Sequence, residues 1–126
     1  MFPLIIWNSR GIGARVKTDF LTSEVRNHKA KMVVIIEHKQ NYDKIQEFTR
    51  KLNMHASMHA APTNKHIWLF WEREVSVELI QAGDQHIPTK VSSGGEELYI
   101  SVVYGSCDAQ RREVLWYELD RFDPGA

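Results

Sequence analysis

The chain has 126 residues, which is enough for one modest domain and too few for two. Charged residues make up 25% of it and the formal net charge is zero, so no overall field favours a polyanion or a membrane surface. The charge is uneven, however. Residues 1–63 carry ten Lys and Arg against five Asp and Glu, whereas residues 64–126 carry six against eleven. The first half could therefore face a phosphate backbone, although any cut through a chain gives some imbalance.

Cysteine content and hydropathy restrict the compartment. Cys107 is the only cysteine, which excludes an internal disulfide and favours a reducing environment. The apolar start Met1–Trp7 is too short for the hydrophobic core of a signal peptide, and no run approaches the ~20 apolar residues of a membrane span. We expect an intracellular protein, nuclear or cytoplasmic, that does not enter a membrane.

The first half of the chain alternates short apolar runs with amphipathic segments. Residues 4–7 are a continuous apolar run closed by Asn8, and residues 32–37 are a second run that ends in Glu37, which predicts two buried strands. A helix is predicted over residues 14–29, with an apolar face formed by Val16, Phe20, Leu21 and Val25. A second helix is predicted at about residues 42–52, with Ile45, Phe48 and Leu52 on one stripe. This β-α-β-α order favours two parallel strands joined by a right-handed crossover.

The second half is dominated by strand patterns. Turn-prone stretches separate four runs, and their short spacing favours antiparallel pairing: residues 66–72, 75–80, 86–91 and 98–105. A third helix is predicted over residues 109–122, with Asp108 as its N-cap. The chain is therefore predicted to be a mixed α/β (α+β) protein.

The glycines after the first strand permit a dinucleotide-binding interpretation. A Rossmann-type phosphate turn needs three glycines in the order G-x-G-x-x-G and an acidic residue about 20 positions later. Gly11 and Gly13 fit this pattern, and Glu37 ends the next strand, but Val16 occupies the third glycine position. Because a β-branched residue obstructs close packing of helix on strand there, we regard this as a weak alternative.

Polar residues at the two predicted strand ends indicate a metal site instead. Asn8 and Glu37 each follow the apolar run of their strand. If the strands are parallel neighbours, backbones ~4.8 Å apart bring both residues to one edge of the sheet. An amide carbonyl and a carboxylate are hard oxygen ligands that suit Mg²⁺ or Mn²⁺. The simpler alternative is that Asn8 only caps the turn and Glu37 is a solvated strand end.

Three stretches carry a family pattern: IIWNSRGIG from Ile5, VVIIEHK from Val33 and SVVYGSCDAQRREVLWYEL from Ser101. They resemble the exonuclease–endonuclease–phosphatase superfamily, and most closely the endonuclease domains of plant non-LTR retrotransposons. In those domains the first strand ends Trp-Asn-Cys-Arg-Gly, the second ends Glu-Thr-Lys, and a later strand ends Val-Tyr-(Ala/Gly) before an Arg-Arg-Glu-rich helix. The resemblance covers essentially the whole chain and implies a deoxyribonuclease-I-like fold, a two-sheet β-sandwich flanked by helices.

The resemblance also implies roles for individual residues. Asn8 matches the family asparagine that orients metal and phosphate, and Glu37 matches the metal-binding glutamate. Tyr104 matches a tyrosine whose phenol lies near the scissile phosphate. The implied chemistry is Mg²⁺-dependent hydrolysis of a nucleic-acid phosphodiester, in which a His-Asp pair activates water. His38 follows Glu37, and we expect it to be solvated.

Departures from the family pattern weaken the expectation of activity. Ser9 stands where the relatives have cysteine, a change that we expect to be tolerated. The family continues with strands that end Gly-Asp-Phe-Asn and Ser-Asp-His, which supply the second carboxylate and the catalytic His-Asp, whereas this chain ends at Ala126. We therefore expect residues 1–126 to form one partial domain, equivalent to the N-terminal half, with little or no catalysis.

Such a half-domain would also leave strand edges and apolar surface uncovered. The aromatic strand that carries Trp68, Phe70 and Trp71 is expected to be the most exposed, unless it lies in a rearranged core. A non-catalytic module that binds nucleic acid or protein is the alternative function, and a nucleotide-binding βαβ protein is a weaker one.

Overall fold

The computed structural model describes residues 3–59, 66–80 and 86–103. Seven strands in this part of the chain form two sheets. The first sheet has the order β1-β2-β4-β3, with these bounds: β1 Leu4–Asn8, β2 Met32–Ile36, β3 Ala56–His59 and β4 Ile67–Trp71. The second sheet has the order β5-β6-β7, with these bounds: β5 Ser76–Leu79, β6 His86–Ser93 and β7 Glu96–Val103.

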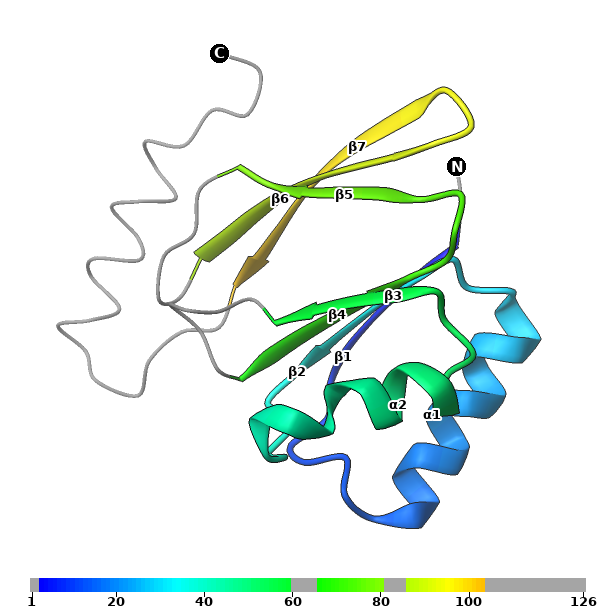
Figure 1. The fold of residues 1–126 in the computed structure, drawn as a ribbon, viewed down its shortest axis with the longest axis vertical. Helices are drawn as coiled ribbons and strands as arrows, with labels where there is room; N and C mark the ends of the chain where they lie inside the picture. The colour runs from blue at the N-terminus through cyan, green and yellow to red at the C-terminus, as the bar shows by residue number, and fades with distance from the viewer. Residues whose placement is uncertain (1–2, 60–65, 81–85, 104–126) are drawn as a thin grey trace, which may run out of the picture.

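The two sheets and the helices form three layers. Helix α1 (Arg15–His28), the 3-10 turn η1 (Tyr42–Lys44) and helix α2 (Ile45–Lys51) cover one face of the first sheet, and the second sheet packs on its other face (Figure 1). This arrangement confirms the predicted two-sheet β-sandwich flanked by helices. No helix in the described ranges is long and apolar enough to cross a membrane.

Strand β2 explains why the first sheet is the middle layer. Successive side chains of a strand point to opposite faces of the sheet. All five residues of β2 are buried, because both faces of the sheet are covered there. Val33 and Ile35 pack into the cluster under the helices, whereas Met32, Val34 and Ile36 pack into the cluster between the sheets. A continuous apolar run is what a strand with both faces covered requires.

The aromatic strand is central rather than exposed. β4 pairs with β2 on one side and with β3 on the other. Trp68 and Phe70 are fully buried and Trp71 is partly buried, so the expectation that this strand would be the most exposed is wrong. Strand β3 was not predicted, and its pairing with β4 is what covers that side of the aromatic strand.

Helix α1 is confirmed, but its predicted apolar face is partly wrong. Leu21 and Val25 are buried as predicted, and Thr18 shares their face. Val16 and Phe20 are 74% and 55% exposed. At ~100° per residue, positions 16 and 20 each lie about 200° from position 18, on the far side of the helix. Helix α2 is confirmed with Ile45, Phe48 and Leu52 buried.

Candidate metal and phosphate site

The carboxyl ends of β1 and β2 lie side by side at one edge of the first sheet. The two strands are parallel neighbours, as predicted, and their register pairs Asn8 with Ile36. Glu37 is therefore one residue beyond the position opposite Asn8. The structure brings both sequence-predicted residues to the edge where α/β sheets usually bind ligands, and their joint binding of a metal stays a proposal.

Backbone hydrogen bonds continue past the ends of the two strands. The Ser9 amide donates to the Ile36 carbonyl at 3.0 Å, and the Gly11 amide donates to the Glu37 carbonyl at 2.7 Å. The Glu37 amide in turn donates to the His66 carbonyl at 2.6 Å. The loop after β1 and the loop after β2 are thus joined to each other, and Glu37 is also fixed to the start of β4.

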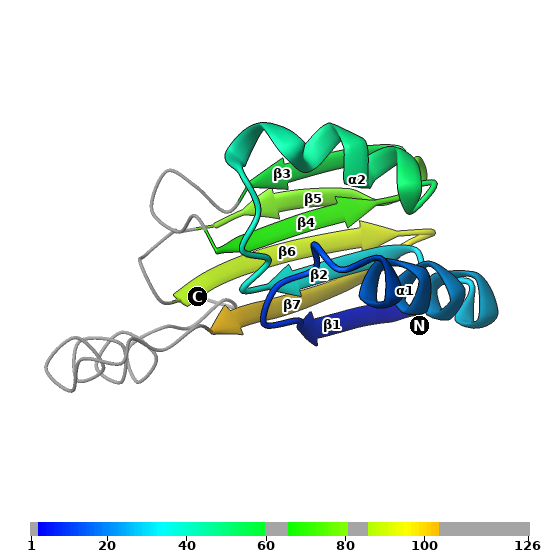
Figure 2. The ribbon, with the colours of Figure 1, turned by 90° about the horizontal axis from the view of Figure 1, so that it is seen from below.

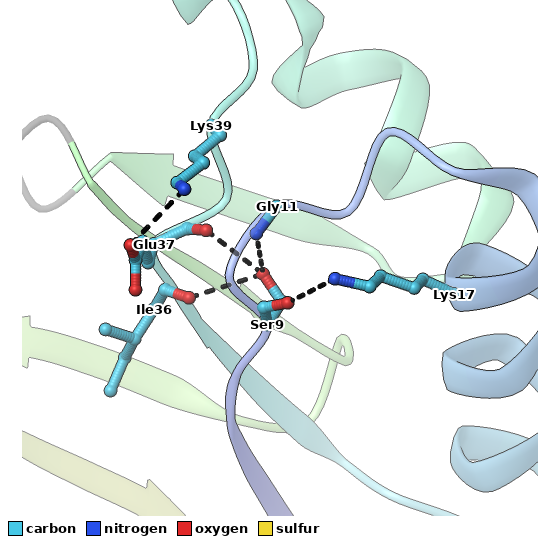
Figure 3. A network of polar contacts seen from close by, with 6 residues as sticks. All are labelled: Ser9, Gly11, Lys17, Ile36, Glu37 and Lys39. Atoms are coloured by element: carbon cyan, nitrogen blue, oxygen red, sulfur yellow. Dashed lines mark hydrogen bonds and ion pairs between the residues drawn. The ribbon is translucent and has the colours of Figure 1, made fainter.

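Ser9 reinforces this connection with its side chain (Figure 3). Its hydroxyl is buried, accepts a hydrogen bond from the Gly11 amide at 3.2 Å, and lies 3.2 Å from the Glu37 carbonyl and 3.3 Å from the Ile36 carbonyl. The Lys17 ammonium donates to the Ser9 carbonyl at 2.8 Å. Sequence reasoning treated Ser9 only as a tolerated replacement, because the partners of its hydroxyl lie 27 and 28 residues away.

Ser9→Ala is expected to lower the free energy of unfolding by about 1–2 kcal/mol, because a buried carbonyl loses its hydroxyl donor. Ser9→Cys keeps a weak donor of similar size and should lose less. Ser23→Ala is the matched control, since the Ser23 hydroxyl has only an exposed contact with Asn27. Urea unfolding of the three variants measures the difference, and equal midpoints for Ser9→Ala and Ser23→Ala would contradict this role.

Glu37 directs its carboxylate away from Ser9 and toward Lys39 (Figure 3). The Lys39 ammonium lies 3.6 Å from Glu37 Oε1, and the side chain of Glu37 is 23% exposed. Three residues of these two loops have left-handed backbones: Arg10 has φ 52°, Glu37 has φ 59° and Lys39 has φ 55°. The site offers one partly accessible carboxylate with the largely exposed ammonium of Lys39 beside it.

His38 is buried, so the expectation that it would be solvated is wrong. Its ring stacks on the Trp68 ring, with centroids 3.8 Å apart and an interplanar angle of 13°. Its Nδ1 accepts a hydrogen bond from the Gln40 amide at 3.0 Å. His38 thus anchors the Glu37–Gln40 loop to the core through Trp68, while the side chains of Glu37 and Lys39 remain at the surface.

Other predicted or possible ligands do not join this site within the described ranges. Tyr104, predicted to lie near phosphate, is outside the described residues, as are residues 109–122, predicted to form the third helix. Among the residues that the structure describes, no group of three or more His, Cys, Asp and Glu side chains is arranged to hold a metal ion.

The glycine turn uses its amides within the chain. Gly11 has φ 103°, a conformation that side chains disfavour, so the turn itself accounts for this glycine. The amides of Gly11 and Ile12 donate to the carbonyls of Glu37 and His38. Because these donors are already occupied, the turn is poorly suited to cradle a phosphate in the manner of a dinucleotide-binding loop.

Comparison with known proteins connects this arrangement to a fold. No family model matches the chain, and no curated protein matches it. Among solved structures, the endonuclease domain of TRAS1, a telomere-specific non-LTR retrotransposon, matches 98% of this chain with a TM-score of 0.69 and 11% identity. Humanized D. rerio TDP2 matches 95% with a TM-score of 0.65 and 13% identity. The fold is the deoxyribonuclease-I-like fold.

A third deoxyribonuclease-I-like structure, D. rerio TDP2 complexed with a single-strand DNA product, matches 97% of this chain with a TM-score of 0.64 and 13% identity. The chain spans 54% of the length of the TRAS1 endonuclease domain, 60% of humanized D. rerio TDP2 and 56% of D. rerio TDP2 with the DNA product. The deoxyribonuclease-I-like fold expected from the sequence is confirmed, and the closer likeness to plant retrotransposon domains stays a prediction.

Proposed function

We propose that this chain carries part of a metal-dependent phosphodiesterase site, which binds Mg²⁺ or Mn²⁺ through Glu37 and Asn8 and presents the ion to a nucleic-acid phosphate. The observation that carries the proposal is the register of β1 and β2 within a deoxyribonuclease-I-like fold, since it puts an amide and a carboxylate at one sheet edge. The superfamily resemblance of the sequence and the TRAS1 endonuclease domain support a retrotransposon origin.

The residues at this edge fit a hard divalent cation. Mg²⁺ commonly binds through one or two carboxylates and keeps several waters or phosphate oxygens. Glu37 is partly accessible and Asn8 is exposed. Within the part of the chain that the structure describes, Glu37 forms an ion pair with a largely exposed lysine, Lys39, at 3.6 Å. Because exposed pairs of this kind contribute only ~0.2–1 kcal/mol, Lys39 is a displaceable occupant of the carboxylate.

The bound ion would polarise phosphoryl oxygens, and the chain's own residues would position it. Glu37 and Asn8 would hold the ion, with the Glu37 backbone fixed by the Ser9 and His66 contacts. Once displaced from Glu37, the Lys39 ammonium would pair with a phosphate oxygen of the nucleic acid. Tyr104 is proposed to lie near the same phosphate.

We further propose that residues 1–126 alone bind but do not hydrolyse. Activation of water by a general base commonly contributes ~10²–10⁴-fold to the rate. His38 is the histidine next to Glu37, but it is buried under the loop and its Nδ1 already accepts a hydrogen bond. The family's second carboxylate and His-Asp pair have no match in this sequence.

Glu37→Gln is expected to weaken Mn²⁺ binding at least about tenfold, because the anionic ligand becomes a neutral amide of the same shape. Mn²⁺ titration followed by electron paramagnetic resonance measures the affinity without any turnover. Glu47→Gln is the matched control. Glu47 also forms ion pairs with lysines, Lys44 and Lys51, but it lies on helix α2 and not at the strand ends. Equal Mn²⁺ affinity in the wild type, Glu37→Gln and Glu47→Gln would overturn the proposed site.

Assays on DNA separate binding from catalysis. We expect the wild type to retard labelled DNA more strongly with Mg²⁺ than without, and to leave supercoiled plasmid intact. Nicking by the wild type that is lost in Glu37→Ala would contradict the proposed inactivity while supporting the site. Metal-independent DNA binding that Glu37→Gln leaves unchanged would instead favour the second candidate, a non-catalytic nucleic-acid module.

A further inference from the structure

A pocket lies at the opposite end of the first sheet from the candidate metal site. Helices α1 and α2 both end where β2 begins and β4 ends, at the right of Figure 2, whereas β1 and β2 end at the left. The pocket between the two helix ends has a volume of about 430 Å³. Because β2 spans five residues at ~3.3 Å each, about 16 Å of strand separates this helix-end pocket from Glu37.

Basic side chains dominate the lining of the helix-end pocket. Three of its lining residues are apolar and buried: Val25, Ala30 and Leu52. Its charged lining residues, within the part of the chain that the structure describes, are four basic residues and one acidic residue: Arg26, Lys29, Lys31, Lys51 and Glu72. A concave surface lined mainly by charges of one sign concentrates its field and attracts ligands of the opposite sign. The lining therefore favours an anionic ligand.

Two of the four basic residues are free to bind such a ligand. Lys31 and Lys51 each pair with a glutamate outside the pocket, with N···O distances of 3.3 Å and 3.2 Å. Arg26 and Lys29 are exposed and form no ion pair within the described ranges. They lie at the end of α1, so two unpaired positive charges meet on one side of the pocket.

The ends of the helices do not account for Lys29. Basic residues in the last turn complement the negative end of a helix, which explains Arg26 and Lys51. Lys29 follows that turn with φ 51°, a left-handed conformation that suits glycine. The Lys29 amide donates to the Arg26 carbonyl at 3.3 Å, and the Ala30 amide donates to the Val25 carbonyl at 3.0 Å. Because backbone amides already cap α1, the Lys29 ammonium is available to an external anion.

We propose that the helix-end pocket binds a phosphate-bearing small molecule of nucleotide size, with its phosphate held by Arg26 and Lys29. A guanidinium pairs with two phosphate oxygens at once, and an ammonium adds a point charge. The volume is larger than a bare phosphate ion fills and lies within the ~300–1,000 Å³ of small-molecule sites. Glu72 disfavours a ligand that is anionic throughout, so the remainder carries hydroxyl or amino donors, as a ribose and a base do. The site does not depend on metal binding by Glu37.

Titration with adenosine monophosphate, followed by backbone amide resonances, tests the location of the site. With no divalent metal present, the amides of Ala30, Asn53 and Glu72 should shift, whereas those of Glu37 and His38 should not. Adenosine and inorganic phosphate should each bind at least about tenfold more weakly, because each lacks part of the proposed contacts. Shifts confined to Glu37 and His38, equal affinity for the three probes, or no saturable shift would overturn the proposal.

Substitutions at the end of α1 test the two cations. Arg26→Gln should weaken binding of adenosine monophosphate at least about tenfold, because the bidentate phosphate contact is lost. Arg50→Gln is the matched control, since Arg50 also lies in the last turn of a helix but does not line the pocket. Lys29→Gly should weaken binding while leaving the urea midpoint unchanged or raising it, because glycine suits the left-handed backbone. Equal affinity in the wild type, Arg26→Gln and Lys29→Gly would restrict these cations to the helix end and overturn the proposal.

A short DNA strand with a terminal phosphate, compared with the same strand without one, distinguishes the two sources of a nucleotide phosphate. Tighter binding of adenosine monophosphate than of the phosphorylated strand supports a free nucleotide as the ligand. Tighter binding of the phosphorylated strand, lost when its terminal phosphate is removed, supports the end of a nucleic acid in the same pocket. Tight binding of both strands at the same amides would mean a backbone-binding surface rather than a nucleotide pocket, and would overturn the proposal.

Discussion

Trp68→Ala is expected to lower the free energy of unfolding by about 3–5 kcal/mol, the usual cost of removing a fully buried aromatic side chain. Trp68 has no exposed surface. Its ring stacks on His38, lies 5.4 Å from the Phe48 ring and meets Phe70 edge to face at 6.1 Å. One substitution therefore leaves a cavity where α2, β4 and the loop after β2 meet.

Urea unfolding followed by circular dichroism measures this loss. Phe20→Ala is the matched control, because Phe20 is also aromatic but is 55% exposed, and it should cost less than about 1 kcal/mol. Trp68→Phe keeps most of the buried surface and should remain folded with an intermediate stability. Similar stabilities for Trp68→Ala and Phe20→Ala would contradict the central position of β4.

Val34→Asp is expected to cost at least ~4 kcal/mol and to prevent stable folding, because it puts a carboxylate between the two sheets without a partner. Val34 is fully buried and belongs to the same cluster as Ile87 of β6 and Val102 of β7. This substitution tests the packing of the second sheet on the first, whereas Trp68→Ala tests the helix side.

The matched control for Val34→Asp is Ser76→Asp, which adds the same side chain to an exposed position of β5. Circular dichroism and size-exclusion elution of both variants give the comparison, with Ser76→Asp expected to behave as the wild type. A folded Val34→Asp protein of unchanged stability would mean that the two sheets do not pack through this cluster.

The local sequence pattern predicted those strands whose formation depends on their own residues. The run MVVIIE predicted a strand buried on both faces, because such a strand must be apolar throughout, and LIIW predicted its parallel neighbour. The predicted burial of LIIW is wrong, because β1 is an end strand whose residues are partly buried or exposed. Strand β3 was missed because residues 56–59 contain only one large apolar side chain, and its strand conformation comes from pairing with β4. The sequence pattern also could not show that β4 belongs to the first sheet and β5 to the second. An alternation of apolar and polar residues predicts a strand but does not show which strand it pairs with.

The candidate site shows the same limit. The ends of β1 and β2 could be predicted to place Asn8 and Glu37 at one edge, and the register agrees with that. The burial of His38 could not be predicted, because it depends on the Trp68 ring thirty residues further along the chain. Sequence likewise gave no sign that Lys39 would pair with Glu37, since adjacent loop residues have no fixed relative orientation.

The left-handed residues at the site carry backbone strain. Among the described residues, five that are not glycine have positive φ; Lys29 and Asn53 terminate helices, and the other three are Arg10, Glu37 and Lys39. Each costs ~1–2 kcal/mol relative to a relaxed backbone, and glycine would avoid the penalty. Glycine at any of these three positions would therefore relax the backbone of the loop and at the same time remove a charged side chain from the strand ends.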